Sequence, residues 1–224
     1  PIVLETADTV FTFPAKSAPD NVIFDADYAM LVDVKSENKP SAQWLYQLKN
    51  GSNYLQKNAA MNALMSSVDN PEVTKALLEK TEDPFWGIRL QAMNTLGTYT
   101  GDDIVPILQR AMDLAKNDPE SKVRRAGLKF VRGVDEDDLE NEGGAQAGSL
   151  KEKVLETLYD CIRDSSYGVL TDALGALASL DEQAALTQAK TLEKEKNSKI
   201  ISAVGALYMD LEQPGAVEYV SEKL

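Results

Sequence analysis

The segments KNAAMNAL at 57–64 and RLQAMNTL at 89–96 decide the fold, because they are two copies of one short pattern. They share Ala, Met, Asn and Leu at four equivalent positions and are offset by 32 residues. Further along the chain, ALGALASL at 173–180 aligns with AVGALYMD at 203–210 at an offset of 30 residues. A unit of this length has room for two helices and their turns. We therefore expect a chain of repeated helix pairs.

From Ser41 onward, apolar residues recur with the period of an α-helix. Asn70-Pro71, Asp83-Pro84 and Asp118-Pro119 each place a capping residue before a proline at the first helical position. With no strand pattern between the helices, about five antiparallel pairs should stack into an α-solenoid. The predicted helices are 41–49, 52–67, 71–80, 85–98, 103–116, 120–132, 148–163, 167–179, 182–194, 198–211 and 214–223.

Alanines occupy the points where the second helices of neighbouring repeats must approach each other. The aligned positions are Ala60, Ala92, Ala126, Ala173 and Ala203. A leucine at such a contact would overpack it by about 1–3 kcal/mol. We expect Ala60, Ala92, Ala173 and Ala203 to be buried.

Residues 1–34 have a different pattern, with short apolar runs separated by turn compositions. This pattern predicts four β-strands in two hairpins, which are too few to bury a core of their own. A polar stretch that ends in Pro40 follows and is typical of a linker. We therefore divide the chain into a β segment at 1–40 and a helical domain at 41–224. The predicted strands are 2–4, 10–13, 22–24 and 30–32.

The second helices resemble those of HEAT repeats. The residues at 83–89 and 118–124 both follow the pattern Asp-Pro-x-x-x-(Ile/Val)-Arg. The later units, at 164–169 and 197–200, keep the turn but lose the arginine. The resemblance implies a HEAT-like α-α superhelix with degenerate repeats.

A wider resemblance covers most of the chain. VFTFPAKSAPDNVIFDADYAMLVDV at 10–34 resembles the last β-sandwich strands of zinc aminopeptidases of the alanyl aminopeptidase family, and SAQWLYQLKNGSNYLQKNAAMNAL at 41–64 resembles the entry helices of their C-terminal solenoid. This resemblance implies a non-catalytic module that packs on an upstream catalytic domain of the same polypeptide and encloses its peptide substrates. Because the sequence starts with Pro1 in strand-like residues, we expect a piece of a longer polypeptide.

The composition argues against catalysis by this chain. It has no histidine and one cysteine, which excludes the His-based catalytic triads, the H-E-x-x-H zinc motif and a thiolate zinc cluster. We therefore expect no catalytic, cofactor-binding or metal-binding residue here, and the resemblance places the zinc in the missing catalytic domain. Two alternatives stay open: a HEAT-repeat protein-interaction scaffold with no link to peptidases, and an inactive aminopeptidase relative that serves as an assembly platform.

The net charge and the hydropathy limit the kinds of partner that we expect for this chain. The net charge of −13 would repel a nucleic-acid backbone, so we expect no nucleic-acid partner. No apolar run approaches the roughly 20 residues that span a bilayer, and we expect no membrane partner.

Five groups of side chains are candidate sites. The acidic run at 135–142 fails the spacing of an EF-hand loop, which favours a solvated loop. Cys161, on a predicted helix, is expected to be a buried thiol, and Asn50-Gly51-Ser52 to be a turn rather than a glycosylation site. The aromatic groups Phe85-Trp86 and Trp44-Leu45-Tyr46 are expected to lie in the core rather than to anchor a ligand.

Three arginines form the last candidate. Arg89, Arg124 and Arg125 are expected to form a ladder of ion pairs between repeats with Asp83 and Asp118. The alternative is that these arginines face a peptide carboxylate in the concave groove.

Overall fold

The computed structural model describes residues 10, 12–32, 38–134, 139 and 147–223. Within these residues it contains eleven α-helices and no strand. When the 3-10 turn Met65–Ser67 is counted with α2, every helix begins and ends within two residues of its predicted range. The helices are α1 (Ser41–Asn50), α2 (Tyr54–Leu64), α3 (Pro71–Lys80), α4 (Trp86–Leu96), α5 (Val105–Asn117), α6 (Ser121–Arg132), α8 (Ala147–Cys161), α9 (Tyr167–Leu180), α10 (Glu182–Leu192), α11 (Ser198–Asp210) and α12 (Ala216–Lys223).

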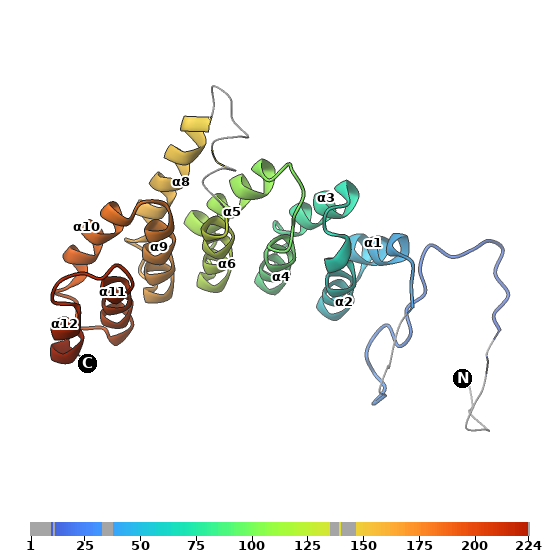
Figure 1. Ribbon diagram of the computed structural model, residues 1–224. Coiled ribbons are helices and arrows are strands. Elements are labelled where there is room, and N and C mark those ends of the chain that lie inside the picture. The colour runs from blue at the N-terminus through green and yellow to red at the C-terminus, as the bar shows by residue number, and fades with distance from the viewer. Residues whose placement is uncertain (1–9, 11, 33–37, 135–138, 140–146, 224) are drawn as a thin grey trace.

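The helices form five antiparallel pairs that follow one another in an arch (Figure 1). The first helix of each pair (α1, α3, α5, α8, α10) lies on the outer side, and the second (α2, α4, α6, α9, α11) lies on the inner side. Contacts run without a break along the inner helices, from α2 to α4, α6, α9 and α11. This confirms the predicted stack of helix pairs, and we call the exposed face of the second helices the inner surface.

The core is a continuous apolar layer between the two rows of helices. Large side chains such as Leu48, Leu77 and Ile107 are fully buried in it. Ala60, Ala92 and Ala173 are also fully buried, as predicted, whereas Ala203 is only half-buried. Ala203 is more exposed because it lines a hollow between α9 and α11.

One glycine sets the distance between α5 and α6. A Cβ on Gly127 would collide with the backbone oxygen of Ala111 and would lie 3.0 Å from the backbone nitrogen of Ala115. Neither backbone atom can rotate away, so only glycine permits this close approach.

The prediction of four N-terminal strands is wrong where the structure describes these residues. Residues 22–24 and 30–32 contain no strand, nor do the described residues 10, 12 and 13 of the run at 10–13, and the run at 2–4 lies outside the described residues. Two hairpins need another sheet or helix layer to cover them, and no strand pairs with this segment in the described residues. The segment instead contacts the first repeat through polar groups: the Ala26 carbonyl oxygen accepts hydrogen bonds from Asn53 Nδ2 (3.2 Å) and Gln56 Nε2 (2.8 Å).

No helix in the described residues is long and apolar enough to cross a membrane.

Candidate functional site

A ladder of ion pairs joins successive repeats at the turns between the first and second helices. In each pair a cation near the start of one second helix contacts an aspartate just before the next second helix. The pairs are Lys57 Nζ–Asp83 Oδ2 at 2.8 Å, Arg89 Nε–Asp118 Oδ2 at 2.6 Å and Arg124 Nε–Asp164 Oδ2 at 2.7 Å.

Each aspartate of the ladder also organises its own turn, because its Oδ1 atom accepts a backbone N–H two residues later. The donors are Phe85 N for Asp83, Glu120 N for Asp118 and Ser166 N for Asp164. Burial opposes the ionisation of Asp83, but Lys57 and the Phe85 N–H outweigh it and hold the pKa of Asp83 below its ordinary value. The aspartates therefore shape the turns and join the repeats.

The central pair is the most enclosed. Asp118 is 2% exposed and Arg89 is 11% exposed. Arg89 Nη2 donates a second bond to Asp118 Oδ1 at 2.8 Å, and its Nη1 donates to the carbonyl oxygens of Asp83 and Pro84. The bond to the Asp118 carboxylate raises the pKa of the Arg89 guanidinium above its ordinary value. The predicted ladder is confirmed for Arg89 with Asp118, and Arg89 is not open to a ligand.

The other two predicted arginines take different partners. Arg124 pairs one repeat further on than the residues considered from sequence, with Asp164. Arg125 lies on the inner surface and pairs with Asp172 of α9 at 2.7 Å, with 52% of the arginine side chain and 35% of the aspartate exposed. Of the three arginines, Arg125 is the one that is open to a ligand.

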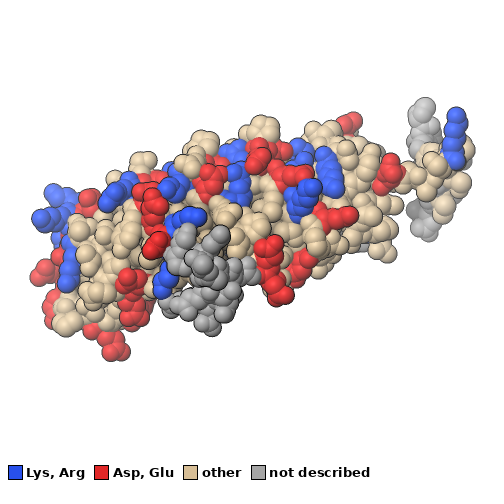
Figure 2. Space-filling model, turned by 90° about the horizontal axis from the view of Figure 1, so that it is seen from above, with Lys and Arg blue, Asp and Glu red and all other residues tan. Residues whose placement is uncertain are grey.

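The second helices contain more basic than acidic residues, although the whole chain is acidic. The five second helices contain eight lysines and arginines and only two aspartates, Asp172 and Asp210. The five first helices contain eight lysines and arginines against seven acidic residues. Figure 2, which views the outer side, accordingly shows the two signs interspersed along its length.

Four cations form a row along α6, which we call the α6 stripe. They are Lys122, Arg125, Lys129 and Arg132, at spacings of three, four and three residues that place them on one helix face. Lys122 Nζ lies 5.0 Å from the ring centre of Trp86 on α4. Within the part of the chain that the structure describes, no hydrogen bond or ion pair engages the Lys129 ammonium or the Arg132 guanidinium.

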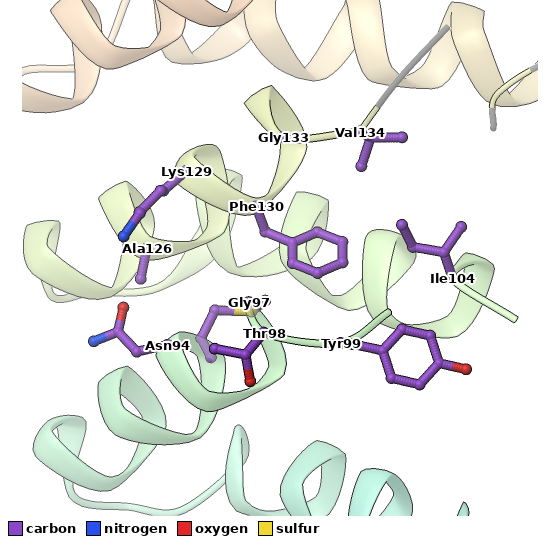
Figure 3. A pocket seen from close by; sticks show the side chains of 11 residues that line it. Asn94, Gly97, Thr98, Tyr99, Ile104, Ala126, Lys129, Phe130, Gly133 and Val134 are labelled. Atoms are coloured by element: carbon purple, nitrogen blue, oxygen red, sulfur yellow. The ribbon is translucent and has the colours of Figure 1, made fainter. Parts of the chain in front are cut away.

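Hollows lie on both sides of the α6 stripe. One of about 180 Å³ lies between α4 and α6, where Figure 3 shows Asn94 and Lys129 at one end and Phe130, Ile104 and Tyr99 at the other. A second, of about 310 Å³, contains Asn94 and the four stripe residues. A third, of about 320 Å³, lies between α9 and α11 and is bordered by Arg132. The inner surface thus offers apolar, amide and cationic groups side by side.

Cys161 and the Asn50-Gly51-Ser52 motif have structural roles, and the acidic run is not tested. Cys161 is buried, its Sγ lies 3.4 Å from the Ala115 carbonyl oxygen, and burial raises the pKa of its thiol to about 11. Asn50 and Ser52 lie at the turn between α1 and α2. The acidic run at 135–142 lies outside the described residues, apart from the buried Leu139.

The aromatic groups are less buried than predicted. Leu45 is in the core, but Trp44 and Trp86 are half-buried and Phe85 is exposed. Phe85 stacks edge-on against Tyr54 with ring centres 5.5 Å apart. Trp44 and Trp86 pack against the edge of the core, whereas Phe85 and Tyr46 are exposed.

Comparison with solved structures supports the helical fold. One chain of the complex of CpcE and CpcF of phycocyanin lyase from Nostoc sp. PCC7120 matches with a TM-score of 0.57 and 21% sequence identity, over 75% of this chain and 96% of that chain. An engineered protein matches with a TM-score of 0.46 and 14% identity, over 80% of this chain and 87% of that chain. No family model and no curated protein matches the chain.

These findings correct the family prediction. The resemblance to the alanyl aminopeptidase family is wrong, because the matched structure with a TM-score of 0.57 is a phycocyanin lyase complex and the predicted sandwich strands are absent from the described part of 10–32. Nothing connects the chain to a zinc-containing catalytic domain or to peptide substrates, and no cluster of three or more potential metal ligands lies in the described residues. At 21% identity the first match shows the fold alone: a mainly helical, HEAT-like solenoid.

Proposed function

We propose that this chain is a non-catalytic HEAT-like scaffold that binds a segment of a partner protein along its inner surface. The observation that carries the proposal is the α6 stripe with its flanking hollows, on a face that no other part of the described chain covers. The matched solved structure is itself a complex of two different proteins, which agrees with a role in protein association.

The shape of the inner surface supports a peptide-like ligand. Helical solenoids form extended concave surfaces of this kind, and each hollow lies between neighbouring second helices. The hollows combine apolar walls such as Leu90 and Phe130 with the Asn94 amide and the charged stripe. An extended polypeptide presents the same mixture of apolar side chains, amides and charges.

Site-specific photo-cross-linking tests this proposal. A benzophenone amino acid is placed at Asn94 on the inner surface or at Gln109, an exposed position on the outer helix α5. We expect the Asn94 probe to capture a defined protein from a lysate of the source cells, and that protein is then purified for affinity measurement. Asn94→Trp, which fills the hollow without changing the charge, should weaken its binding, and Gln109→Trp should not.

Two results would contradict the proposal. One is equal capture of the same proteins from both probe positions. The other is an affinity for the purified partner that Asn94→Trp leaves unchanged.

A further inference from the structure

The α6 stripe is electrostatically unfavourable for the isolated chain. Lys122 with Arg125, Arg125 with Lys129, and Lys129 with Arg132 are like-charged neighbours three or four residues apart, an arrangement that destabilises a helix. Asp172 offsets one of these four charges. The fold obtains no ion pair from Lys129 or Arg132 within the described residues. A row of cations with this cost and so few partners is suited to an anionic ligand.

The neighbouring helix α9 keeps the two arginines of the stripe accessible. Gly175 lies beside Arg132, with Nη1 at 3.4 Å from the place where a Cβ would be, and Gly168 lies beside Arg125 in the same way. A side chain at either position would approach the guanidinium group. Glycine therefore leaves these groups open toward the inner surface.

We propose that the α6 stripe recognises an acidic segment of the partner protein through carboxylate groups; this inference rests on the scaffold function proposed above. Charge complementarity selects the ligand, because the stripe is the largest accumulation of positive charge on the second helices, with four of their eight cations. Carboxylates fit Arg132 in particular, since a guanidinium can bind a carboxylate through two parallel hydrogen bonds.

A nucleic acid fits this surface less well than a polypeptide. At physiological salt, electrostatic interactions are screened over about 8 Å, so the stripe acts locally while the net charge of −13 surrounds it. A long phosphate backbone would extend from the stripe into acidic surroundings, whereas a short acidic segment would not. The hollow that Lys129 borders also has apolar walls, including Phe130 and Ile104, which match apolar side chains between carboxylates.

The length of the stripe defines the segment. Lys122 and Arg132 are ten residues apart, which corresponds to about 15 Å along a helix. An extended peptide covers that distance with about five residues, and alternate side chains point to the same side. Two or three carboxylates at alternate positions can therefore contact the stripe.

The test measures how tightly the chain binds fluorescein-labelled 12-residue peptides. The peptides consist of Gly, Ser and Leu and carry zero, two, four or six glutamates. We expect the affinity to rise with the number of glutamates and to fall with added NaCl. Lys129→Gln/Arg132→Gln should weaken binding of the six-glutamate peptide about tenfold, because two charge contacts of modest strength are lost together. The matched control is Lys75→Gln/Lys190→Gln, which removes two exposed lysines from the outer helices α3 and α10.

Several outcomes would overturn the inference. The first is that the six-glutamate peptide does not bind detectably at low salt. The second is that the affinity does not depend on the number of glutamates, and the third is that the stripe and control variants lose the same affinity for the peptide. Tighter binding of a 12-nucleotide single-stranded DNA would assign the stripe to nucleic acid instead. If Asn94→Trp releases the cross-linked partner but Lys129→Gln/Arg132→Gln does not, the scaffold function stands and this inference is wrong. Circular dichroism should show the same helix content in all variants.

Discussion

Replacing Asp118 by Asn is expected to destabilise the chain far more than the same change at Asp172. Both aspartates pair with an arginine at similar distance, 2.6 Å for Asp118 with Arg89 and 2.7 Å for Asp172 with Arg125. They differ in exposure, since Asp118 is 2% exposed and Asp172 is 35% exposed. Asparagine keeps an oxygen that can accept the Glu120 N–H, so the change at Asp118 removes the charge and spares the turn.

The expected magnitudes follow from the environment of each arginine. Asp118→Asn leaves the Arg89 guanidinium enclosed and unpaired, which costs about 3 kcal/mol. Asp172→Asn leaves Arg125 in contact with water, so the loss is at most about 0.5 kcal/mol. Arg89→Met combined with Asp118→Asn should recover part of the first loss, because no buried charge then lacks a partner.

Urea unfolding followed by circular dichroism gives these free energies, and equal denaturant slopes in all variants show that the same surface is exposed. Similar losses for Asp118→Asn and Asp172→Asn would refute the reasoning, because burial would then not control the strength of the pair. The reasoning would also be refuted if the loss for Arg89→Met with Asp118→Asn equalled the sum of the losses for Arg89→Met alone and Asp118→Asn alone, since Arg89 and Asp118 would then not be coupled.

Three further predictions concern packing and titration. Gly127→Ala should lower the free energy of unfolding by about 1–3 kcal/mol, measured in urea, because its Cβ meets the α5 backbone at Ala111; an unchanged stability would show that the helices can move apart. Asp83 has a folded-state pKa below its ordinary 3.8, so the stability that it contributes is complete above about pH 4 and is lost as the pH falls through the folded-state pKa. The urea midpoints at pH 5 and pH 3 should therefore differ less in Asp83→Asn than in the unmodified chain. Cys161 has a pKa of about 11 against an ordinary 9.0, so at pH 8 iodoacetamide should alkylate it at least about a hundredfold more slowly than in the urea-unfolded chain. The contribution of Cys161 to stability should decline between pH 9 and pH 11, and Cys161→Ala should show no such decline.

The helical part of the fold could be predicted from sequence because the signals are local. The apolar period places each helix, and a capping residue before proline marks helix starts such as that of α3 at Pro71. The shared alanines at Ala60 and Ala92 indicate the contact between repeats, which the structure confirms. Ala203 is the exception, because a hollow remains between α9 and α11 at this position.

The N-terminal prediction failed because strand formation depends on a partner strand that sequence alone does not supply. The runs at 22–24 and 30–32 are wholly apolar, but no described strand lies beside them. The sequence also contains Gln56 where later repeats have a buried apolar residue such as Ile88. Its amide binds the Ala26 carbonyl, a contact that no periodicity would have indicated.

The candidate site was only partly predictable. Sequence reasoning selected Arg89, Arg124 and Arg125, and the first two are held in ion pairs between repeats. It missed Lys129 and Arg132, although the spacing of cations along 120–132 already places four of them on one face. The sequence alone does not show how many acidic residues lie near these cations, because that depends on how α4 and α9 pack beside α6.

The ladder also gives every repeat a direction. The cation comes from the start of one second helix and the aspartate from the turn of the next repeat, so a repeat joins its neighbours in one order only. A repeat inserted by recombination or by design must therefore bring a basic residue for its successor and an aspartate for its predecessor. Leu170 occupies the basic position in the fourth repeat, and the series ends there. Only the second and third repeats carry both partners and are thus exchangeable modules with matching ends. The first repeat has only the basic residue, the fourth has only the aspartate, and the fifth takes part in no ladder pair among the described residues.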